Sequence, residues 1–501
     1  MKNLITTAFI ASAILFSGCN KNFDPVLTGV LSPADFPKTE VDFELYTLQA
    51  YKPFGSKWGY NDVAYQNMFF SPEYGHLVMF DLPTDEFNIS TQWGGFWEGF
   101  SKGDFTFIRT QGKASHFEKV RYVSRMTKVI DDIAKSSIPD AKKSLFTAEA
   151  RMGRGWAMYY LLHMYGPVPV IIDPAKINTE AEADLTRPSR DFFVNSIEAD
   201  LRFAADNLVK TPAQYGRFNK GLALGTLMRL YLNEKNYLKA EPVGREIVAL
   251  GYSLVTDYAS LFKEITEKNS ETIYAITVDP AAPTNGDGGG NFNAMPLYCL
   301  PNDFKSFKLN GGWGNSAGIF CPTWQFYDSF AANDKRRELM IPSYTAKNGT
   351  TIRDRSNMPG PVLRKYTDES TPGADVQGND FPILRYADVL LMLAEAISHN
   401  NNGPTAEAIG YVDEIRLKHA GLGGLLPSAT ASVEAFDEAI LKERGWDLYF
   451  EGVRKFDLVR HGKWEAALQS VGKIPGPNHL LPVPQYAIDV SNNKLTPTPG
   501  Y

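Results

Sequence analysis

Apolar residues between Ile383 and Ile397 recur every three to four positions, which is the spacing along one face of an α-helix. The apolar stripe covers most of the helix circumference, so the pattern predicts a buried helix with Pro382 near its start. The run Asn-Asn-Asn-Gly-Pro at 400–404 ends it. A second, amphipathic helix follows, with apolar positions at Ala406, Ile409, Val412 and Ile415. The two helices form a predicted hairpin.

The stretch from Leu222 to Leu250 has the same plan, with two apolar stripes on either side of a polar turn at 233–236. Leu227, Tyr231 and Ala240 fall at offsets typical of tetratricopeptide repeats. The opening Trp and the late Pro of that repeat are missing, and any helical hairpin shows similar spacing. The offsets alone therefore leave the repeat type open.

Further stretches of helical period occur along the chain. They predict helices at 32–51, 117–133, 149–165 and 190–208, and a last strong element at 435–462. The Pro-rich residues 480–501 are expected to be extended. We therefore expect an all-α dominated fold of tetratricopeptide-like helical hairpins, over about 117–252 and 381–462, with a loop-rich part.

Two long stretches, about 54–103 and 263–330, are expected to be rich in loops. Irregular segments of this length are usually functional or disordered, and the many aromatic residues in the first of them argue against disorder. Aromatic residues make up 13% of the chain, which has 41 Gly and 31 Pro. The sequence therefore predicts a helical platform that carries aromatic loops.

Charge is nearly balanced, with 51 basic and 57 acidic residues among 501. A nucleic-acid binder would normally show a basic face, and the sequence has none. The glycine-rich run at 286–291 lacks the strand–helix context and the Lys of a phosphate loop. Asp279 and Asp287 lack the spacing of a calcium loop. We expect no cofactor and no metal site, although the residues leave open whether a calcium ion is bound.

Residues 1–18 have the features of a signal peptide: Lys2, then an apolar core too short to span a bilayer, then Ser-Gly. Cys19 follows, as at a bacterial lipoprotein cleavage site, where the new terminal Cys carries lipid. The alternative is an ordinary secretory signal with a chance Cys. Asn20, in place of an Asp, favours the outer membrane. Export would permit a disulfide between Cys299 and Cys321, but two reduced, buried thiols fit equally well.

Two groups of side chains are candidates for a catalytic or ligand-binding role. Glu443 and Glu451 can be interpreted as the acid–base pair of a glycoside hydrolase. Carboxylates interleaved with Arg at this density more often form structural salt bridges, so we expect no enzyme. His163 lies inside a predicted helix, where a core or interface role is favoured over that of a ligand.

Several blocks taken together resemble the SusD/RagB-like family of outer-membrane nutrient-binding lipoproteins. Besides the lipoprotein start, the blocks are 148–151, 165–169, 221–252, 322–324 with Asp334, 385–396, 443–462 and 481–501. The blocks that begin at Arg385 and Glu443 are the specific ones. The resemblance covers nearly the whole chain and implies one SusD-like domain over 19–501.

The resemblance also implies a function. A surface-exposed lipoprotein of this family captures an oligosaccharide or polysaccharide and delivers it to a SusC-like TonB-dependent outer-membrane transporter. Some RagB-like relatives capture peptides instead, and the sequence does not name the cargo. The aromatic loops are suited to glycan capture, because the apolar face of a sugar stacks on an aromatic ring while its hydroxyls bind polar groups.

The aromatic loops supply the candidate binding residues. We expect stacking by Trp58, Trp93, Trp97, Tyr298 and Trp313. Hydroxyl partners are expected at Asn61, Asp62, Asn88 and Asn315. The remaining tryptophans are expected to pack in the structure: Trp156, Trp446 and Trp464 in helices, and Trp324 in a family block.

Overall fold

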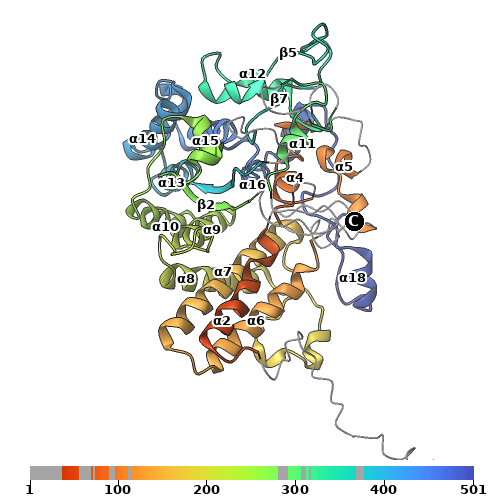
Figure 1. Ribbon diagram of the computed structural model, residues 1–501, viewed down its shortest axis with the longest axis vertical. Helices are drawn as coiled ribbons and strands as arrows, with labels where there is room; N and C mark the ends of the chain where they lie inside the picture. The colour runs from red at the N-terminus through yellow and green to blue at the C-terminus, as the bar shows by residue number, and fades with distance from the viewer. Residues whose placement is uncertain are drawn as a thin grey trace, which may run out of the picture.

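The computed structural model describes residues 36–55, 69–71, 74–89, 96–110, 116–279, 292–305, 312–314, 318–367 and 377–501. Helices dominate these ranges, and strands are few and short (Figure 1). The expected all-α dominated fold with tetratricopeptide-like hairpins is confirmed. None of the helices in the described ranges combines the length and the apolar content needed to cross a membrane.

A stack of paired helices forms the scaffold. It consists of α6 (Lys119–Lys135), α7 (Asp140–Tyr165), α8 (Arg190–Asn207), α9 (Lys220–Asn233), α10 (Tyr237–Ala249), α13 (Tyr386–Asn400) and α14 (Ala406–Ile415). Each helix packs on the next, and α2 (Glu40–Thr47) lies against α6 and α7. Residues 250–385 separate α10 from α13 in the sequence, yet these two helices pack together. The two predicted hairpin regions therefore belong to one continuous stack.

Polar caps define where these helices begin. The side chains of Ser189, Asn219 and Asn236 accept hydrogen bonds from the first-turn N–H groups of α8, α9 and α10. At the other end of α7, Gly166 adopts a φ of +74° and Pro167 follows. A left-handed Gly followed by Pro stops a helix, which explains the stop expected there.

The predicted start of the helix at Pro382 is wrong. Phe381–Arg385 forms strand β8, which pairs antiparallel with β2 (Thr272–Ile276), and α13 begins only at Tyr386. Pro382 lies opposite Ala275, beside a register shift in the ladder. The missing N–H of Pro is tolerated at such an irregularity.

The loop-rich part contains short ladders and short helices at the upper end of the molecule in Figure 1. The other ladders are β1 (Phe87–Ile89) with β3 (Phe320–Pro322), β4 (Met340–Ile341) with β7 (Val362–Leu363), and β5 (Tyr344–Thr345) with β6 (Ile352–Arg353). The short helices are α4 (His76–Phe80), α5 (Phe96–Lys102), α11 (Met295–Cys299) and α12 (Trp324–Ser329). Further 3₁₀ segments are η1 (Leu48–Phe54), η3 (Thr106–Arg109), η5 (Pro174–Lys176), η6 (Glu180–Ala183), η7 (Tyr258–Phe262), η8 (Glu264–Thr266), η9 (Lys335–Leu339) and η11 (Pro427–Thr430).

The C-terminal region holds α15 (Val433–Leu448), α16 (Arg454–Arg460), α17 (Trp464–Ser470) and α18 (Gln485–Val490), after the π-helical turn η10 (Arg416–Ala420). Helix α18 interrupts the tail that was expected to be extended. Cys299 and Cys321 are both free and buried. Burial raises the pKa of both thiols, that of Cys321 to about 12, so both stay protonated at neutral pH.

Candidate ligand-binding site

Three of the five predicted stacking residues lie together in the described structure. The ring centroid of Tyr298 is 5.3 Å from that of Trp313 and 6.2 Å from that of Trp97, with nearly perpendicular rings in both pairs. Phe320 stacks on Tyr298 at 5.5 Å and meets Trp97 edge to face at 5.7 Å. We call Trp97, Tyr298, Trp313 and Phe320 the aromatic cluster. It joins α5 to α11 and β3, which come much later in the sequence.

Exposure differs sharply within the aromatic cluster. Tyr298 is 0% exposed and Trp97 is 8% exposed, whereas Trp313 is only half-buried. A fully buried ring offers no face to a ligand, so the expected stacking by Tyr298 does not fit this structure. Tyr298 instead packs edge to face against the Trp313 ring. Trp313 is the member of the aromatic cluster that is best placed to touch a ligand.

Backbone contacts fix the position of Trp313. Its N–H donates to the carbonyl of Leu297 at 2.7 Å, and the Ile319 N–H donates to the carbonyl of Tyr298 at 2.6 Å. Gly318 has a φ of +85°, and a Cβ there would lie 2.3 Å from the carbonyl oxygen of Cys299. Only glycine allows this close approach. The backbone on both sides of the cluster is therefore held against α11.

Buried charges hold the segment that leads to Trp97. The Lys473 Nζ donates to the carbonyls of Leu82 (3.2 Å), Thr84 (2.7 Å) and Phe87. Burial lowers the pKa of Lys473 to about 7. The Asp81 carboxylate accepts hydrogen bonds from the N–H groups of Gly452 and Arg454. Residues near the C-terminus therefore place β1 and, through its pairing with β3, the Phe320 ring.

The other predicted site residues are only partly placed. Trp58 and Trp93, together with Asn61, Asp62 and Asn315, lie outside the described residues, as does Cys19. Asn88 is half-buried in β1, next to Ile89, which pairs with Phe320. Asn88 therefore lies near the aromatic cluster, and its role as a hydroxyl partner stays a prediction.

Phe320 is the member of the aromatic cluster that sequence reasoning missed. It lies in the apolar run Ile319-Phe320-Cys321, directly before the family block at 322–324. A short apolar run before a helix cap is a strand signal, and that signal could have placed Phe320. Of the other tryptophans, Trp156 and Trp464 are buried and pack in the core, whereas Trp324 and Trp446 are half-buried.

Glu443 and Glu451 belong to a buried network of ion pairs. Glu443 contacts Arg336 at 2.6 Å and Arg416 at 2.9 Å. Glu451 contacts Arg385 and Lys365, each at 2.7 Å. Both carboxylates are buried and paired, so neither can reach a substrate in this structure. The geometry fits the structural interpretation rather than the hydrolase.

His419 occupies the centre of this network. It is fully buried, with Nδ1 at 2.7 Å from Asp447 and Nε2 at 3.0 Å from Glu271. Burial disfavours its charged form, but the two carboxylates outweigh burial and raise the pKa of His419 to about 9. His419 is therefore protonated at neutral pH and links η10 to α15 and to the residue before β2.

His163 has a different environment. Its ring packs against Tyr159 and Phe456, and Asn233 lies 3.3 Å from Nε2. Burial lowers the pKa of His163 to about 3, so the ring is neutral and serves packing. Within the described residues, no group of three or more His, Cys, Asp or Glu side chains is arranged to hold a metal ion. Asp287 lies outside those residues.

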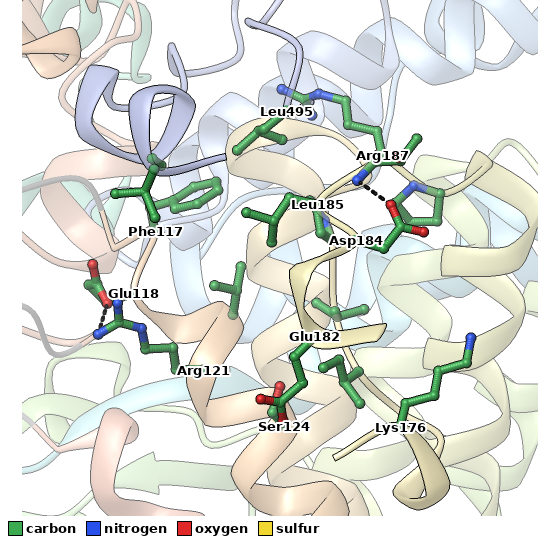
Figure 2. A pocket seen from close by; sticks show the side chains of 18 of the residues that line it. Phe117, Glu118, Arg121, Ser124, Lys176, Glu182, Asp184, Leu185, Arg187 and Leu495 are labelled. Carbon is green, nitrogen blue, oxygen red and sulfur yellow. Dashed lines mark hydrogen bonds and ion pairs between the residues drawn. The ribbon is translucent and has the colours of Figure 1, made fainter. Parts of the chain in front are cut away.

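A separate groove of about 870 Å³ lies between α6, residues 169–188 and α18. Figure 2 shows Phe117, Leu185 and Leu495 on one side of it and Ser124, Glu182 and Lys176 on the other. Its lining includes apolar side chains and charges of both signs. Among the residues that the structure describes, the lining of the groove includes none of the aromatic cluster.

Comparison with known proteins defines the class of this fold. A family model described as the SusD family matches residues 342–501, and one described as starch-binding, associating with outer membrane, matches residues 113–232. SusD-like protein P2 from Formosa agariphila is 24% identical over 98% of this chain and 95% of its own length.

Solved structures show the same fold. Surface glycan-binding protein A from Bacteroides fluxus matches with a TM-score of 0.75 and 21% identity, over 93% of this chain and all of that one. Surface glycan-binding protein A from Bacteroides thetaiotaomicron, in complex with laminarihexaose, matches with a TM-score of 0.74 and 18% identity, over 92% and 99% of the two chains. The chain is therefore similar to SusD-like proteins in sequence and in fold.

Proposed function

We propose that this protein is a surface-exposed glycan-binding protein that captures an oligosaccharide or polysaccharide nutrient. The observation that carries the proposal is the aromatic cluster, in which the half-buried Trp313 lies against the buried Tyr298. A rigidly held, partly exposed aromatic ring suits the apolar face of a sugar. The starch-binding description of one family model and the laminarihexaose bound to a structural neighbour support the same cargo class.

The proposal includes a membrane anchor. Residues 1–18 act as a lipoprotein signal peptide, and Cys19 becomes the lipid-carrying first residue of a SusD-like domain over 19–501. The charged start, short apolar core and Ser-Gly-Cys ending support this assignment. The outer-membrane association in the description of the matched family model supports the location.

The proposed partner is a SusC-like TonB-dependent transporter in the same membrane, which receives the captured glycan. A single stacked ring contributes only about 1.5–3 kcal/mol, so binding is weak enough for release to a transporter. The burial and pairing of Glu443 and Glu451 support binding without turnover.

Affinity electrophoresis tests the proposal. The protein starting at Asn20 is run in gels that contain laminarin, starch, or plant and microbial polysaccharides. We expect retardation by at least one glycan, with affinity about tenfold or more weaker for Trp313→Ala because a stacking face is lost. Trp446→Ala is the matched control, since Trp446 is also half-buried but lies outside the aromatic cluster.

Two results would contradict the proposal. One is the absence of retardation by every glycan, and the other is equal retardation of the Trp313→Ala and wild-type proteins. If no glycan retards the protein, calorimetry with mixed peptides tests the alternative cargo. Heat from peptides without any glycan binding would indicate a peptide-capturing protein.

A further inference from the structure

A row of alternating arginine and aromatic side chains lies along helix α12. The guanidinium of Arg355 is 4.5 Å from the ring centroid of Trp324, and that of Arg337 is 4.0 Å from the ring centroid of Tyr327. Trp324 and Tyr327 meet edge to face at 5.8 Å, and both are half-buried. We call Arg355, Trp324, Tyr327 and Arg337 the arginine–aromatic row.

Arg337 is the unusual member of this row. Its side chain has no ion pair and no hydrogen bond to any part of the chain that the structure describes, and its buried Nε lacks a partner. Its neighbour Arg336 contacts Asp334, Glu443 and Asp447. The Nε atom is buried, so only the outer N–H groups of the half-buried Arg337 side chain can meet an anion.

The other arginine of the row is already neutralised. Arg355 contacts Asp328 at 2.5 Å, and both side chains are about half exposed. The unpaired positive charge of the row therefore belongs to Arg337. Its stacking on Tyr327 occupies the guanidinium face and leaves the N–H groups at the edge, which is the geometry for a bidentate oxyanion.

We propose that the arginine–aromatic row is a subsite for an acidic sugar residue, one that carries a carboxylate or a sulfate ester. The oxyanion binds the edge of the Arg337 guanidinium, and the sugar ring lies beside Tyr327 and Trp324. This inference rests on the proposed function, because it extends the same glycan site. The inference specifies the class of glycan that is captured, namely a negatively charged polysaccharide.

The row lies close to the aromatic cluster along the chain. Trp324 follows Phe320 of the aromatic cluster by four residues, so their Cα atoms are at most about 15 Å apart. The chain as a whole has a formal net charge of −6 and gives no general attraction for polyanions. Binding of an acidic glycan must therefore depend on a local site such as Arg337.

The test compares three proteins with three probes. Wild type, Arg337→Gln and Arg125→Gln are titrated with polygalacturonate, carrageenan and neutral laminarin. Arg125 is an exposed residue of α6 and gives the same change of charge at a distant element. We expect Arg337→Gln to bind the acidic glycan about tenfold more weakly, as for a lost charged hydrogen bond. Laminarin binding and the Arg125→Gln variant should be unchanged.

The outcomes separate the two proposals. If no acidic glycan binds, or if Arg337→Gln and Arg125→Gln behave alike, the arginine–aromatic row is not a subsite, although laminarin binding would keep the proposed function. Equal binding of DNA would also overturn it, because that indicates plain charge attraction. Preference between polygalacturonate and carrageenan identifies a carboxylate or a sulfate. If Arg337→Gln does not fold, Arg337→Lys against Arg125→Lys gives the same test, since Lys lacks the planar fork.

Discussion

Tyr298 and Trp313 touch each other but should respond differently to substitution. Tyr298 is fully buried within the aromatic cluster, so its ring contributes to stability, whereas Trp313 is only half-buried. The distinction follows from burial alone, since both residues are large aromatics and lie within one cluster.

We expect Tyr298→Ala to lower the free energy of unfolding by about 3–5 kcal/mol, the usual cost of deleting a buried aromatic ring. Glycan affinity should fall as well, because Trp313 loses its support. Urea denaturation measures the first effect, with Trp313→Ala as the comparison. A smaller loss of stability for Tyr298→Ala than for Trp313→Ala would show that Tyr298 does not hold the cluster together.

For single residues, the sequence predicts which aromatic residues belong to the candidate binding site better than it predicts which of them are exposed to a ligand. Trp313 stands among Gly and Asn residues, which is a recognisable loop pattern. The burial of Tyr298 depends on Trp97 and Phe320, which come from distant parts of the chain. No local pattern around Tyr298 carries that information.

At the scale of elements, helix α9 and strand β8 approach each other very closely. A Cβ placed on Gly225 in α9 would lie 2.1 Å from Cδ2 of Leu384 in β8. The contact joins the helical stack to the strand that leads into α13. A side chain at position 225 would require the Leu384 side chain to shift.

We expect Gly225→Ala to lower the free energy of unfolding by about 1–3 kcal/mol through overpacking. Leu384→Ala in the same chain should recover part of that loss, so a double-mutant cycle by urea denaturation should show coupling. Gly410→Ala in α14 is the control, since nothing lies within 4 Å of its added Cβ and alanine favours a helix. Additive effects of the two substitutions would refute the contact.

The same region shows why the predicted helix start failed. Ile383 and Leu384 continue the apolar pattern of α13, and a short buried strand cannot be told from a buried helix by period alone. The partner strand β2 lies more than a hundred residues earlier. Helices α9, α10 and α14 were predictable because each has its own stripe and cap, without information from a distant partner.

At the scale of the whole molecule, the ion-pair network around His419 ties the helical stack to the loop-rich part. His419 in η10 contacts Glu271 beside β2 and Asp447 in α15, and Arg385 before α13 contacts the same two carboxylates. The network therefore makes stability depend on pH.

We expect wild-type stability to exceed that of His419→Gln most at low pH. The pKa of His419 rises on folding from 6.5 to about 9, so its contribution is complete below pH 6.5 and is lost as the pH rises through 9. The loss should approach about 3 kcal/mol. Guanidinium denaturation from pH 6 to 9.5 gives the difference between the two proteins.

The test depends on the difference in the free energy of unfolding between wild type and His419→Gln, because other groups also change the pH dependence of each protein. Lys365 has its pKa lowered by burial to about 8, and it also titrates in this range. A difference that does not shrink between pH 6.5 and 9 would mean that His419 is not charged in the folded protein. The size of the network could not be predicted from the sequence, because its acids and bases come from six separate segments.

The contact between α10 and α13 has a consequence for synthesis. Gly244 of α10 lies against Leu393 of α13, but 136 residues, 250–385, come between the two helices. A chain that grows from its N-terminus exposes the apolar side of α10 until the residues after 385 have appeared. Loop closure over this length is slow, so the nascent chain must be shielded from aggregation. A chain truncated before α13 would leave this apolar side exposed and would be prone to aggregation and degradation.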